Sequence, residues 1–429
     1  MNYEQTKEFL YSWLPVFHRQ GASAYKANLD STIRFMTALQ HPENKFKSIH
    51  VAGTNGKGSS SHILASIMRE YGLRTGLHTS PHLRDLTERI VVNGKQASKN
   101  YVIQFVKTNE KIIKEISPSF FEMMVAMAFN YFANNVDIAV IEVGMGGRLD
   151  STNIITPEVS LITNISFDHT QFLGDTLEKI AGEKAGIIKR NIPVVVSQTQ
   201  KETKEVFEMK AKEMNSKIYF ADQRLSVRND RLENGFLVMD IYKDNKLYID
   251  NLQSSLTGDY QKKNILGVIQ TIEALNETGK YKITKENIKD GVKNVQKNFT
   301  LMGRWQTLST NPLTICDTGH NEDGLHYVLS QLNSMKKNSL HFVFGVVNDK
   351  DIDTEIKMLP KDAIYYLCKA DIPRGLDVNV LAEKFSDYSM QYSVYPSVKD
   401  ALKQAQKDAL KTKGMVFVGG STYTVAEIV

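Results

Sequence analysis

The sequence has only two cysteines, Cys316 and Cys368, and both lie in apolar runs. Neither has a neighbour at the spacing of a zinc or redox motif, which excludes a disulfide framework and favours a reducing compartment. The first residues, MNYEQTKEFLYSW, lack the basic start and apolar stretch of a signal peptide. No apolar run approaches the ~20 residues that a membrane-spanning helix needs. These absences predict a cytoplasmic protein with no membrane partner.

The chain also lacks low-complexity segments, fixed-period repeats and blocks of like charge. A net charge of +5 is mild for 429 residues, so we expect weak attraction of anionic small molecules and no nucleic-acid partner. Hydrophobic residues make up 41% and charged residues 24%, as in ordinary globular proteins. A chain of this length predicts two or three domains, because single hydrophobic cores stop growing near ~250–300 residues.

Short apolar runs alternate with helical patterns from Ile49 onward, which is typical of βαβ units around a mostly parallel sheet. Expected strands cover 48–52, 137–143, 158–164 and 193–197, and expected helices cover 59–71, 120–134 and 177–189. The runs FLVMDIY and KLYIDNL flank the polar turn KDN and predict a β-hairpin beside the main sheet. Helices over 260–277 and 285–295 should complete this part of the chain.

The strand and helix pattern restarts near Phe299–Trp305 and continues to the C-terminus through PLTICD, LHFVFGVV, AIYYLC, QYSVY and MVFVGG. We therefore predict two α/β domains. Residues 1–298 should form a doubly wound, mostly parallel, P-loop ATPase-like domain with a small added β-hairpin region. Residues 301–429 should form a smaller Rossmann-like α/β domain.

The stretch HVAGTNGKGSSSHILASIM places a glycine-rich turn between an apolar run and an amphipathic helix. Backbone N–H groups and a helix N-terminus then face one point, which is a binding site for phosphate. The spacing is not that of a general Walker motif, so a plain strand-to-helix turn with a solvated lysine remains an alternative. The predicted nucleotide-binding residues of this loop are Gly53, Thr54, Asn55, Gly56, Lys57, Gly58 and Ser59.

Further blocks follow in a characteristic order: HTSPHLRDLTERI, FFEMMVAMAFNYF, DIAVIEVGMGGRLDSTNII, ITNISFDHTQFLGDTLEKIAGEKAGIIK, GRWQ, DTGHNEDG and GGSTYTVAEI. Together with GTNGKGS, they resemble the folylpolyglutamate synthase/dihydrofolate synthase branch of the Mur ligase superfamily over nearly the whole chain. The resemblance implies an ATP-dependent amide ligase that adds L-glutamate to dihydropteroate, to reduced folates, or to both. An acyl phosphate would be the intermediate, with release of ADP and phosphate, and a monomer is expected.

The resemblance also implies Mg2+, with two sites, and a ligand set of Ser80, Glu142 and His169. A glutamate at the carboxyl end of a buried strand lies where open α/β sheets bind ligands, and Mg2+ takes such oxygen ligands. His169 is an unusual Mg2+ ligand, and a histidine in this setting is more often a hydrogen-bonding group. Lys184 is implied to be carbamylated, although a solvated lysine paired with a nearby glutamate is the ordinary alternative. The predicted catalytic residues are Lys57, Lys184 and His169.

Family positions outside the loop supply further predictions. Nucleotide contacts are implied for Asn264, Arg304, Asp317 and His320, with ATP lying between the domains. The block DTGHNEDG departs from the commoner DGAHNP of the family, which makes the shape of this turn less certain. Predicted substrate-binding residues are Lys26, Ala27, Asn28, Leu29, Arg89, Ser119, Phe120, Phe121, Glu122, Leu149, Asp150, Ser151 and Ser421. Core packing is an alternative role for Phe120 and Phe121, and an ordinary salt bridge for Arg304.

Two other functions compete with this interpretation. A related ligase of cell-wall precursors would normally carry another N-terminal domain, and the residues before Ile49 are too few to build one. A regulatory protein with a degenerate nucleotide site is disfavoured because Lys57, Glu142, His169 and Lys184 are all present. The sequence does not distinguish dihydropteroate from reduced folates as the acceptor.

Overall fold

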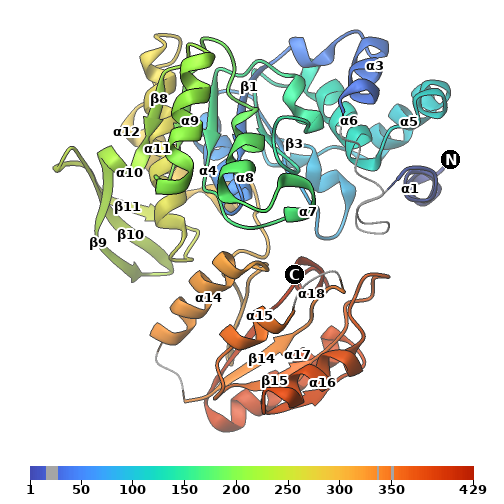
Figure 1. The fold of residues 1–429 in the computed structure, drawn as a ribbon, viewed down its shortest axis with the longest axis vertical. Coiled ribbons are helices and arrows are strands. Elements are labelled where there is room, and N and C mark those ends of the chain that lie inside the picture. Colours follow the sequence, from blue (N-terminus) through green and yellow to red (C-terminus); the bar gives the residue numbers. More distant parts are fainter. Residues whose placement is uncertain (16–27, 336–337, 349–351) are drawn as a thin grey trace. The chain divides into compact units, whose positions relative to one another are not determined.

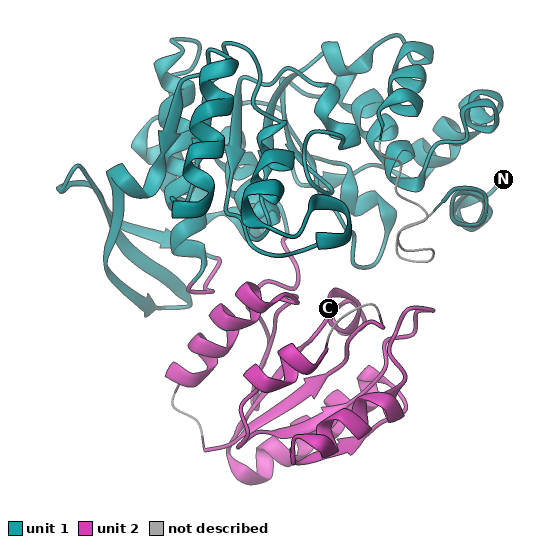
Figure 2. Ribbon diagram, in the orientation of Figure 1, with its two compact units in different colours: residues 1–255, 260–300 teal, residues 256–259, 301–429 magenta. Residues whose placement is uncertain are grey.

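A computed structural model describes residues 1–15, 28–335, 338–348 and 352–429. The chain divides into two compact units (Figure 2). Unit 1 comprises residues 1–255 and 260–300, and unit 2 comprises residues 256–259 and 301–429. In the described part, no helix is both long enough and apolar enough to span a membrane.

Unit 1 is built around an eight-stranded sheet with the order β4-β3-β2-β5-β1-β6-β7-β8 (Figure 1). The six strands from β2 to β8 in this order are parallel, and β3 and β4 are antiparallel at one edge. The strands are β1 Lys47–Ala52, β2 Thr75–His78, β3 Val91–Val92, β4 Lys95–Gln96, β5 Ile138–Glu142, β6 Val159–Ile162, β7 Val194–Val196 and β8 Ile218–Phe220. This confirms the predicted doubly wound, mostly parallel sheet.

Helices cover both faces of this sheet. On one face, α4 Lys57–Glu70 and α11 Gln261–Glu277 pack on the central strands. On the other face, helices bury two apolar clusters against the sheet. These helices are α1 Tyr3–Trp13, α3 Asp30–Ala38, α5 Lys99–Ile116, α6 Phe120–Asn135, α8 Leu177–Ala185 and α9 Lys201–Glu213. The central strands are buried on both sides, which explains their nearly continuous apolar sequences.

Most of the predicted bounds agree with the structure to within two residues, and three predictions differ by more. Helix α8 ends at Ala185 rather than at residue 189. The next residue, Gly186, packs against the backbone of Arg148, where a Cβ would lie 2.3 Å from the Arg148 Cα. The expected helix 285–295 is two helices, α12 Lys285–Lys293 and α13 Val295–Asn298. The predicted hairpin, β10 Phe236–Lys243 with β11 Lys246–Ser254, gains a third antiparallel strand, β9 Leu225–Glu233.

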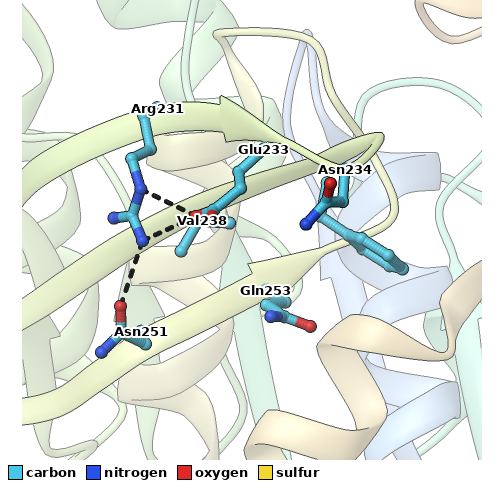
Figure 3. A pocket seen from close by; sticks show the side chains of 7 residues that line it. Arg231, Glu233, Asn234, Val238, Asn251 and Gln253 are labelled. Atoms are coloured by element: carbon cyan, nitrogen blue, oxygen red, sulfur yellow. Dashed lines mark hydrogen bonds and ion pairs between the residues drawn. The ribbon is translucent and has the colours of Figure 1, made fainter.

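A pocket of about 410 Å³ lies on one face of this three-stranded sheet (Figure 3). Phe236 and Val238 form its apolar part, and Arg231, which also lines it, is hydrogen-bonded to Glu233 and Asn251. None of the residues predicted from the sequence as site residues lines this pocket. The phosphate-binding loop follows β1 of the eight-stranded sheet, not a strand of this small sheet.

Unit 2 contains a six-stranded sheet with the order β12-β13-β17-β14-β15-β16, in which only β12 is antiparallel. The strands are β12 Gln306–Thr310, β13 Leu313–Cys316, β14 Leu340–Phe344, β15 Ile364–Leu367, β16 Tyr392–Val394 and β17 Met415–Gly419. The helices are α14 Glu322–Ser334, α15 Ile352–Met358, α16 Val378–Asp387, α17 Val398–Thr412 and α18 Thr422–Ala426. The predicted second, smaller α/β fold is confirmed.

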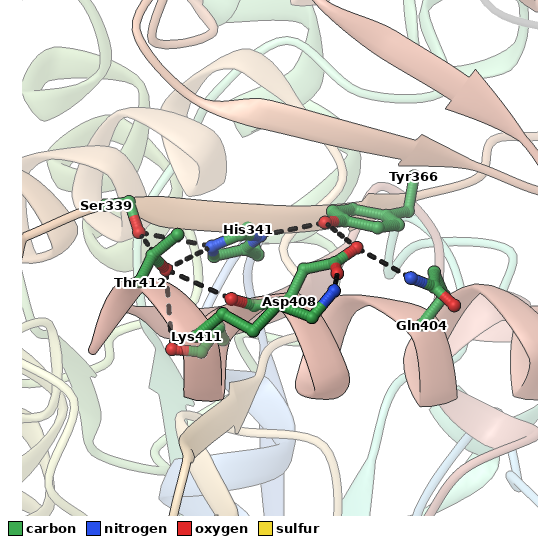
Figure 4. A network of polar contacts seen from close by, with 8 residues as sticks. Ser339, His341, Tyr366, Gln404, Asp408, Lys411 and Thr412 are labelled. Atoms are coloured by element: carbon green, nitrogen blue, oxygen red, sulfur yellow. Dashed lines mark hydrogen bonds and ion pairs between the residues drawn. The ribbon is translucent and has the colours of Figure 1, made fainter.

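A polar network joins β14, β15 and α17 in unit 2 (Figure 4). The ring of His341 is fully buried, with Nδ1 2.8 Å from Tyr366 Oη and Nε2 2.9 Å from Thr412 Oγ1. Tyr366 in turn donates to Asp408 Oδ2 at 3.1 Å, and Lys411 pairs with Asp408 Oδ1 at 2.7 Å. Burial lowers the pKa of His341, and the charge of Asp408 opposes this only in part.

We predict that acid destabilises unit 2 through His341. A histidine whose pKa is lowered by folding stabilises the fold above its unfolded pKa of about 6.5, and this contribution is lost as the pH falls below that value. In a Trp13→Phe background, the fluorescence of buried Trp305 during urea unfolding should show a lower midpoint at pH 5.5 than at pH 7.5. His341→Gln should reduce this difference. His326→Gln, at an exposed position of α14, should leave it unchanged, and equal behaviour of the two variants would refute the prediction.

Candidate active site

The phosphate loop, residues 53–59, connects β1 to α4 at the carboxyl edge of the unit 1 sheet. Gly56 caps α4 with φ of 87°, so the helix begins at Lys57 and its first N–H groups face the loop. The Lys57 ammonium donates to the carbonyl oxygens of Gly53 at 2.9 Å and Thr54 at 3.0 Å. A loop of backbone N–H groups at a helix N-terminus is a binding site for polyphosphate.

The segment after β6 holds the phosphate loop in place. Asn164 accepts the N–H of Asn55 at 2.8 Å through its side chain and the N–H of Thr54 at 2.9 Å through its carbonyl. The hydroxyl of Thr163 donates to the carbonyl of Asn55 at 2.6 Å, and Ser166 N–H donates to Thr54 Oγ1 at 3.0 Å. These three supporting residues were not among the predicted site residues, although they belong to the quoted motif ITNISFDH.

Asn264, a predicted nucleotide-binding residue, lies directly against the loop. It sits on α11, is 4% exposed, and donates to Gln261, which donates to Ser59 Oγ at 3.1 Å. A Cβ on Gly56 would lie 2.2 Å from Asn264 Oδ1. The loop therefore leaves no space for a side chain at Gly56.

Gly56→Ala should lower the affinity for ADP at least tenfold, because both the positive φ and the contact with Asn264 oppose a Cβ. Calorimetric titration with ADP would measure this effect. Gly72→Ala is the matched control, since Gly72 follows the other end of α4 with φ of 98° and has open space around its Cβ position. Both variants should lose some stability, and equal ADP affinities in the two would contradict the prediction.

Glu142 ends β5 beside the phosphate loop. It is 4% exposed, its Oε2 accepts the N–H of Ser80 at 2.9 Å, and its Oε1 lies 3.5 Å from the position a Cβ of Gly58 would take. The structure thus brings together two of the three predicted metal ligands with the loop. His169, at φ of 50°, immediately precedes the short helix α7 Thr170–Leu173, and its Nε2 lies 3.8 Å from Oδ1 of the neighbouring Asp168.

Lys184 on α8 is 4% exposed, and its Nζ donates to the carbonyl of Gly53 at 2.9 Å. The same carbonyl oxygen accepts from Lys57. Burial, and then the charge of Lys57, lower the pKa of Lys184 to about 7, against opposing contributions from Asp168 and Asp150. Lys184 is therefore not the solvated lysine that its sequence context would otherwise indicate, and it carries a neutral amine for much of the time near neutral pH.

A cationic and aromatic cluster lies near the same edge. The guanidinium of Arg89 stacks 5.3 Å from the centroid of Phe120, and its Nε donates to His82 Nδ1 at 2.8 Å. The ring of Tyr11 stacks on Phe120 at 5.1 Å. Phe121 lies against Gly144, where a Cβ would meet the ring at 2.4 Å. The structure thereby places Phe121 against the loop that follows Glu142, and Arg89 and Phe120 against each other.

Other predicted substrate-binding residues have structural partners. Ser119 and Glu122 form a capping box at the start of α6, and Glu122 also accepts from Thr32 at 3.2 Å. Asn28 accepts the N–H of Asp30, next to Leu29, which precedes α3. Leu149, Asp150 and Ser151 follow β5, and the Asp150 carboxylate accepts from its own loop. Lys26 and Ala27 lie outside the described residues.

In unit 2, the predicted residues Arg304, Asp317 and His320 converge on one turn after β13. Asp317 is 3% exposed and accepts the N–H groups of Trp305 and Gly319, each at 2.7 Å. Arg304 donates to the hydroxyl of Thr318, which stands at one of the positions where the motif departs from its commoner form. His320 Nδ1 lies 2.9 Å from the carbonyl of Thr318. Ser421 caps α18 after the neighbouring strand β17.

Comparison with known proteins agrees with this geometry. The family described as Mur ligase middle domain matches residues 51–272, and the Mur ligase glutamate ligase domain matches residues 303–422. A dihydrofolate synthase/folylpolyglutamate synthase of Bacillus subtilis is 31% identical over 427 residues, 97% of each chain. The chain belongs to the folylpolyglutamate synthase/dihydrofolate synthase family. It is therefore an ATP-dependent ligase of the Mur type.

Solved structures of family members superpose along the whole chain. Mycobacterium tuberculosis folylpolyglutamate synthase complexed with ADP has a TM-score of 0.89 at 28% identity, covering 99% of this chain and 97% of that one. Escherichia coli FolC in complex with DHPP and ADP has a TM-score of 0.84 at 26% identity, covering 100% and 97%. The fold that presents the phosphate loop is thus one that binds adenine nucleotides in these relatives.

Proposed function

We propose that this ligase joins L-glutamate to a pterin-bearing carboxylate, either dihydropteroate, a reduced folate, or both, through an acyl phosphate. The observation that carries the proposal is the placement of buried Glu142 against Gly58 of the phosphate loop. Arg89, whose carbonyl lies 2.8 Å from His78 Nδ1 at the end of β2, stacks on Phe120 and supplies a cation beside an aromatic surface. A cation and an aromatic surface suit an acceptor that has both a carboxylate and a flat ring.

ATP is the phosphoryl donor in this proposal. The phosphate loop cradles the polyphosphate, and Lys57 exchanges its two carbonyl partners for phosphate oxygens, whose charge it neutralises. Asn264 fixes the loop from α11. Arg304, Asp317 and His320 of unit 2 are proposed to contact the rest of the nucleotide, and Ser421 the substrate.

Mg2+ is proposed to bind with the nucleotide. The described residues contain no group of three or more His, Cys, Asp and Glu arranged to hold a metal ion. This fits Mg2+, which commonly uses one or two carboxylates, waters and substrate phosphates rather than a cage of protein ligands. Glu142 would supply the carboxylate, with Ser80 and His169 as the other proposed ligands. Bound Mg2+ would neutralise the charge that develops on the phosphate oxygens.

Lys184 is proposed to carry a carbamate. Its buried amine, with a pKa near 7, provides the neutral nitrogen that attacks CO2. An N–C bond forms, one proton is released, and the lysine changes from a potential cation into an anion. Such an anion beside the phosphate loop would orient a cation there, while an uncharged or positive Lys184 would not.

The proposed chemical steps follow once the bound reactants are positioned. The acceptor carboxylate attacks the γ-phosphorus, ADP leaves, and the amine of glutamate attacks the acyl phosphate to form an amide with loss of phosphate. The protein contributes orientation and electrostatic stabilisation of the dispersed negative charge. A monomer is sufficient for this chemistry and is the proposed state.

The direct test is phosphate release that depends on ATP, Mg2+ and L-glutamate, measured separately with 7,8-dihydropteroate and with tetrahydrofolate. Turnover with both would establish a bifunctional ligase, and turnover with one would assign the enzyme to that acceptor. If a folded protein that binds ADP releases no phosphate with either acceptor, the proposed substrate class is wrong.

A further inference from the structure

A chain of hydrogen bonds runs from the centre of the unit 1 sheet to the loop after β5. His50, on β1, is fully buried, and its Nε2 lies 2.9 Å from Thr152 Oγ1. The hydroxyl of Thr152 donates to Asp150 Oδ1 at 2.5 Å. A threonine hydroxyl has one proton, which goes to the carboxylate, so its oxygen accepts from His50 Nε2–H. The two hydrogen bonds therefore run in one direction, with His50 donating to Thr152 and Thr152 donating to Asp150.

This series of hydrogen bonds ends at Asp150, which holds together the loop that carries the proposed acceptor-binding residues. Asp150 Oδ1 accepts the N–H of Thr152 at 3.0 Å, and Oδ2 accepts the N–H of Met145 at 2.9 Å. Both carboxylate oxygens are thus bound within the loop. Burial raises the pKa of Asp150, and these hydrogen bonds oppose that shift by favouring the ionised carboxylate. Because Leu149 and Ser151 flank Asp150, their backbone positions depend on how this carboxylate is held.

The buried ring of His50 has a feature that packing alone does not explain. Its Nδ1 has no hydrogen-bond partner among the described residues. A buried polar atom without a partner is unfavourable, and an aliphatic side chain would fill the same space without that cost. Burial and the nearby charge of Lys189 lower the pKa of His50 to about 3, so the ring is neutral at physiological pH. A neutral ring with its proton on Nε2 can donate the hydrogen bond that Thr152 Oγ1 accepts.

The nucleotide side of the site is held by other residues. Thr163, Asn164 and Ser166 bind the phosphate loop, whereas Thr152 bonds to His50 and Asp150 bonds within the loop after β5. Loss of the His50 donor should therefore disturb the loop after β5 and leave the phosphate loop in place.

We propose that His50 is a positioning residue for the acceptor substrate, acting through Thr152 and Asp150 on the segment 149–151. This inference rests on the proposed function in one respect, the assignment of that segment to the acceptor. In this proposal His50 itself touches no reactant, because its ring is fully buried and reaches the segment through the hydroxyl of Thr152.

Binding measurements test the inference without requiring turnover. Calorimetry with 7,8-dihydropteroate at saturating ADP, and separately with ADP, should be run on wild type, His50→Leu and His50→Gln. We expect His50→Leu to weaken acceptor binding about tenfold and to change ADP affinity less than about twofold. His50→Gln retains an N–H donor and should recover most of the loss. A general loosening of the fold would weaken both ligands together and lower Tm.

A double-variant cycle tests whether His50 acts through Thr152. Thr152→Val removes the hydroxyl at nearly constant volume, and His50→Leu should weaken acceptor binding less than about twofold further in that background. An unchanged acceptor affinity in His50→Leu, or full additivity in the cycle, would overturn the inference. So would a wild-type protein that binds ADP but not the acceptor. Acceptor binding without glutamate-dependent phosphate release would instead count against the proposed reaction.

Discussion

Lys184→Ala is expected to lower kcat at least ~10³-fold, equivalent to about 4 kcal/mol of transition-state stabilisation. Lys184 is buried, and its Nζ lies within hydrogen-bond distance of the same Gly53 carbonyl that Lys57 contacts. If Lys184 carries a carbamate, the substitution removes an anion from the edge of the phosphate loop. Steady-state phosphate release at saturating ATP, glutamate and acceptor would measure the loss.

The same hypothesis predicts how activity depends on CO2 and pH. Carbamate formation needs the neutral amine, which predominates above the pKa of about 7 and is lost as the pH falls below it. Wild-type enzyme depleted of CO2 should therefore regain activity on addition of bicarbonate, with a smaller fraction of carbamate at pH 6 than at pH 8. Lys184→Ala should not respond to bicarbonate.

Lys179→Ala is the matched control for Lys184→Ala. Lys179 lies on the same helix, α8, but its side chain is 62% exposed and pairs with Asp175. It should retain nearly full activity, because an exposed ion pair contributes little. A Lys184→Ala enzyme with more than a tenth of wild-type kcat would show that Lys184 has no essential part in catalysis.

The sequence predicted β1, β5, β6 and β7 of the unit 1 sheet and β13 to β17 of the unit 2 sheet, because each is a short apolar run between turns. It missed β2, β3, β4, β8 and β12. Strands buried on both faces have such runs whatever their neighbours are. The third strand of the small sheet, β9, was missed because its sequence LSVRNDRLE is largely exposed and charged, as is common at a sheet edge. The split of α12 from α13 was missed because apolar periodicity continues across the break.

The loop glycines, Lys57 and Glu142 could be predicted because strand-to-helix turns and strand ends are local features. The partners that hold them could not. Asn164 binds Asn55 across 109 residues, and Gln261 reaches Ser59 across 202. Such pairings depend on strand order and helix packing, which a single sequence does not encode in any local pattern. The capping roles of Ser119 and Glu122 follow from a serine three residues before a glutamate, a signal that sequence reading can use.

Glu142→Gln should separate metal binding from the structural role of this side chain. Glutamine keeps an oxygen that can accept the N–H of Ser80, so the loop geometry should persist, while the negative charge is lost. We expect kcat to fall about 10²–10³-fold, because the charge on the transferring phosphoryl group is then less well neutralised. The Mg2+ concentration for half-maximal activity should also rise. Titration of phosphate release with MgCl2 would measure both effects.

Glu158→Gln provides a control for the loss of a buried carboxylate. Glu158 precedes β6 at the opposite end of the same sheet, is 7% exposed, and pairs with Lys280 at 2.7 Å and Lys47 at 3.2 Å. Those ion pairs hold the pKa of Glu158 below its usual range, so the substitution should lower Tm without changing the Mg2+ requirement. If a metal binds at the carboxyl end of β5, Glu142→Gln should raise the Mg2+ requirement and Glu158→Gln should not. If Glu142→Gln loses stability but keeps the wild-type Mg2+ dependence, Glu142 is a structural residue and the metal binds elsewhere.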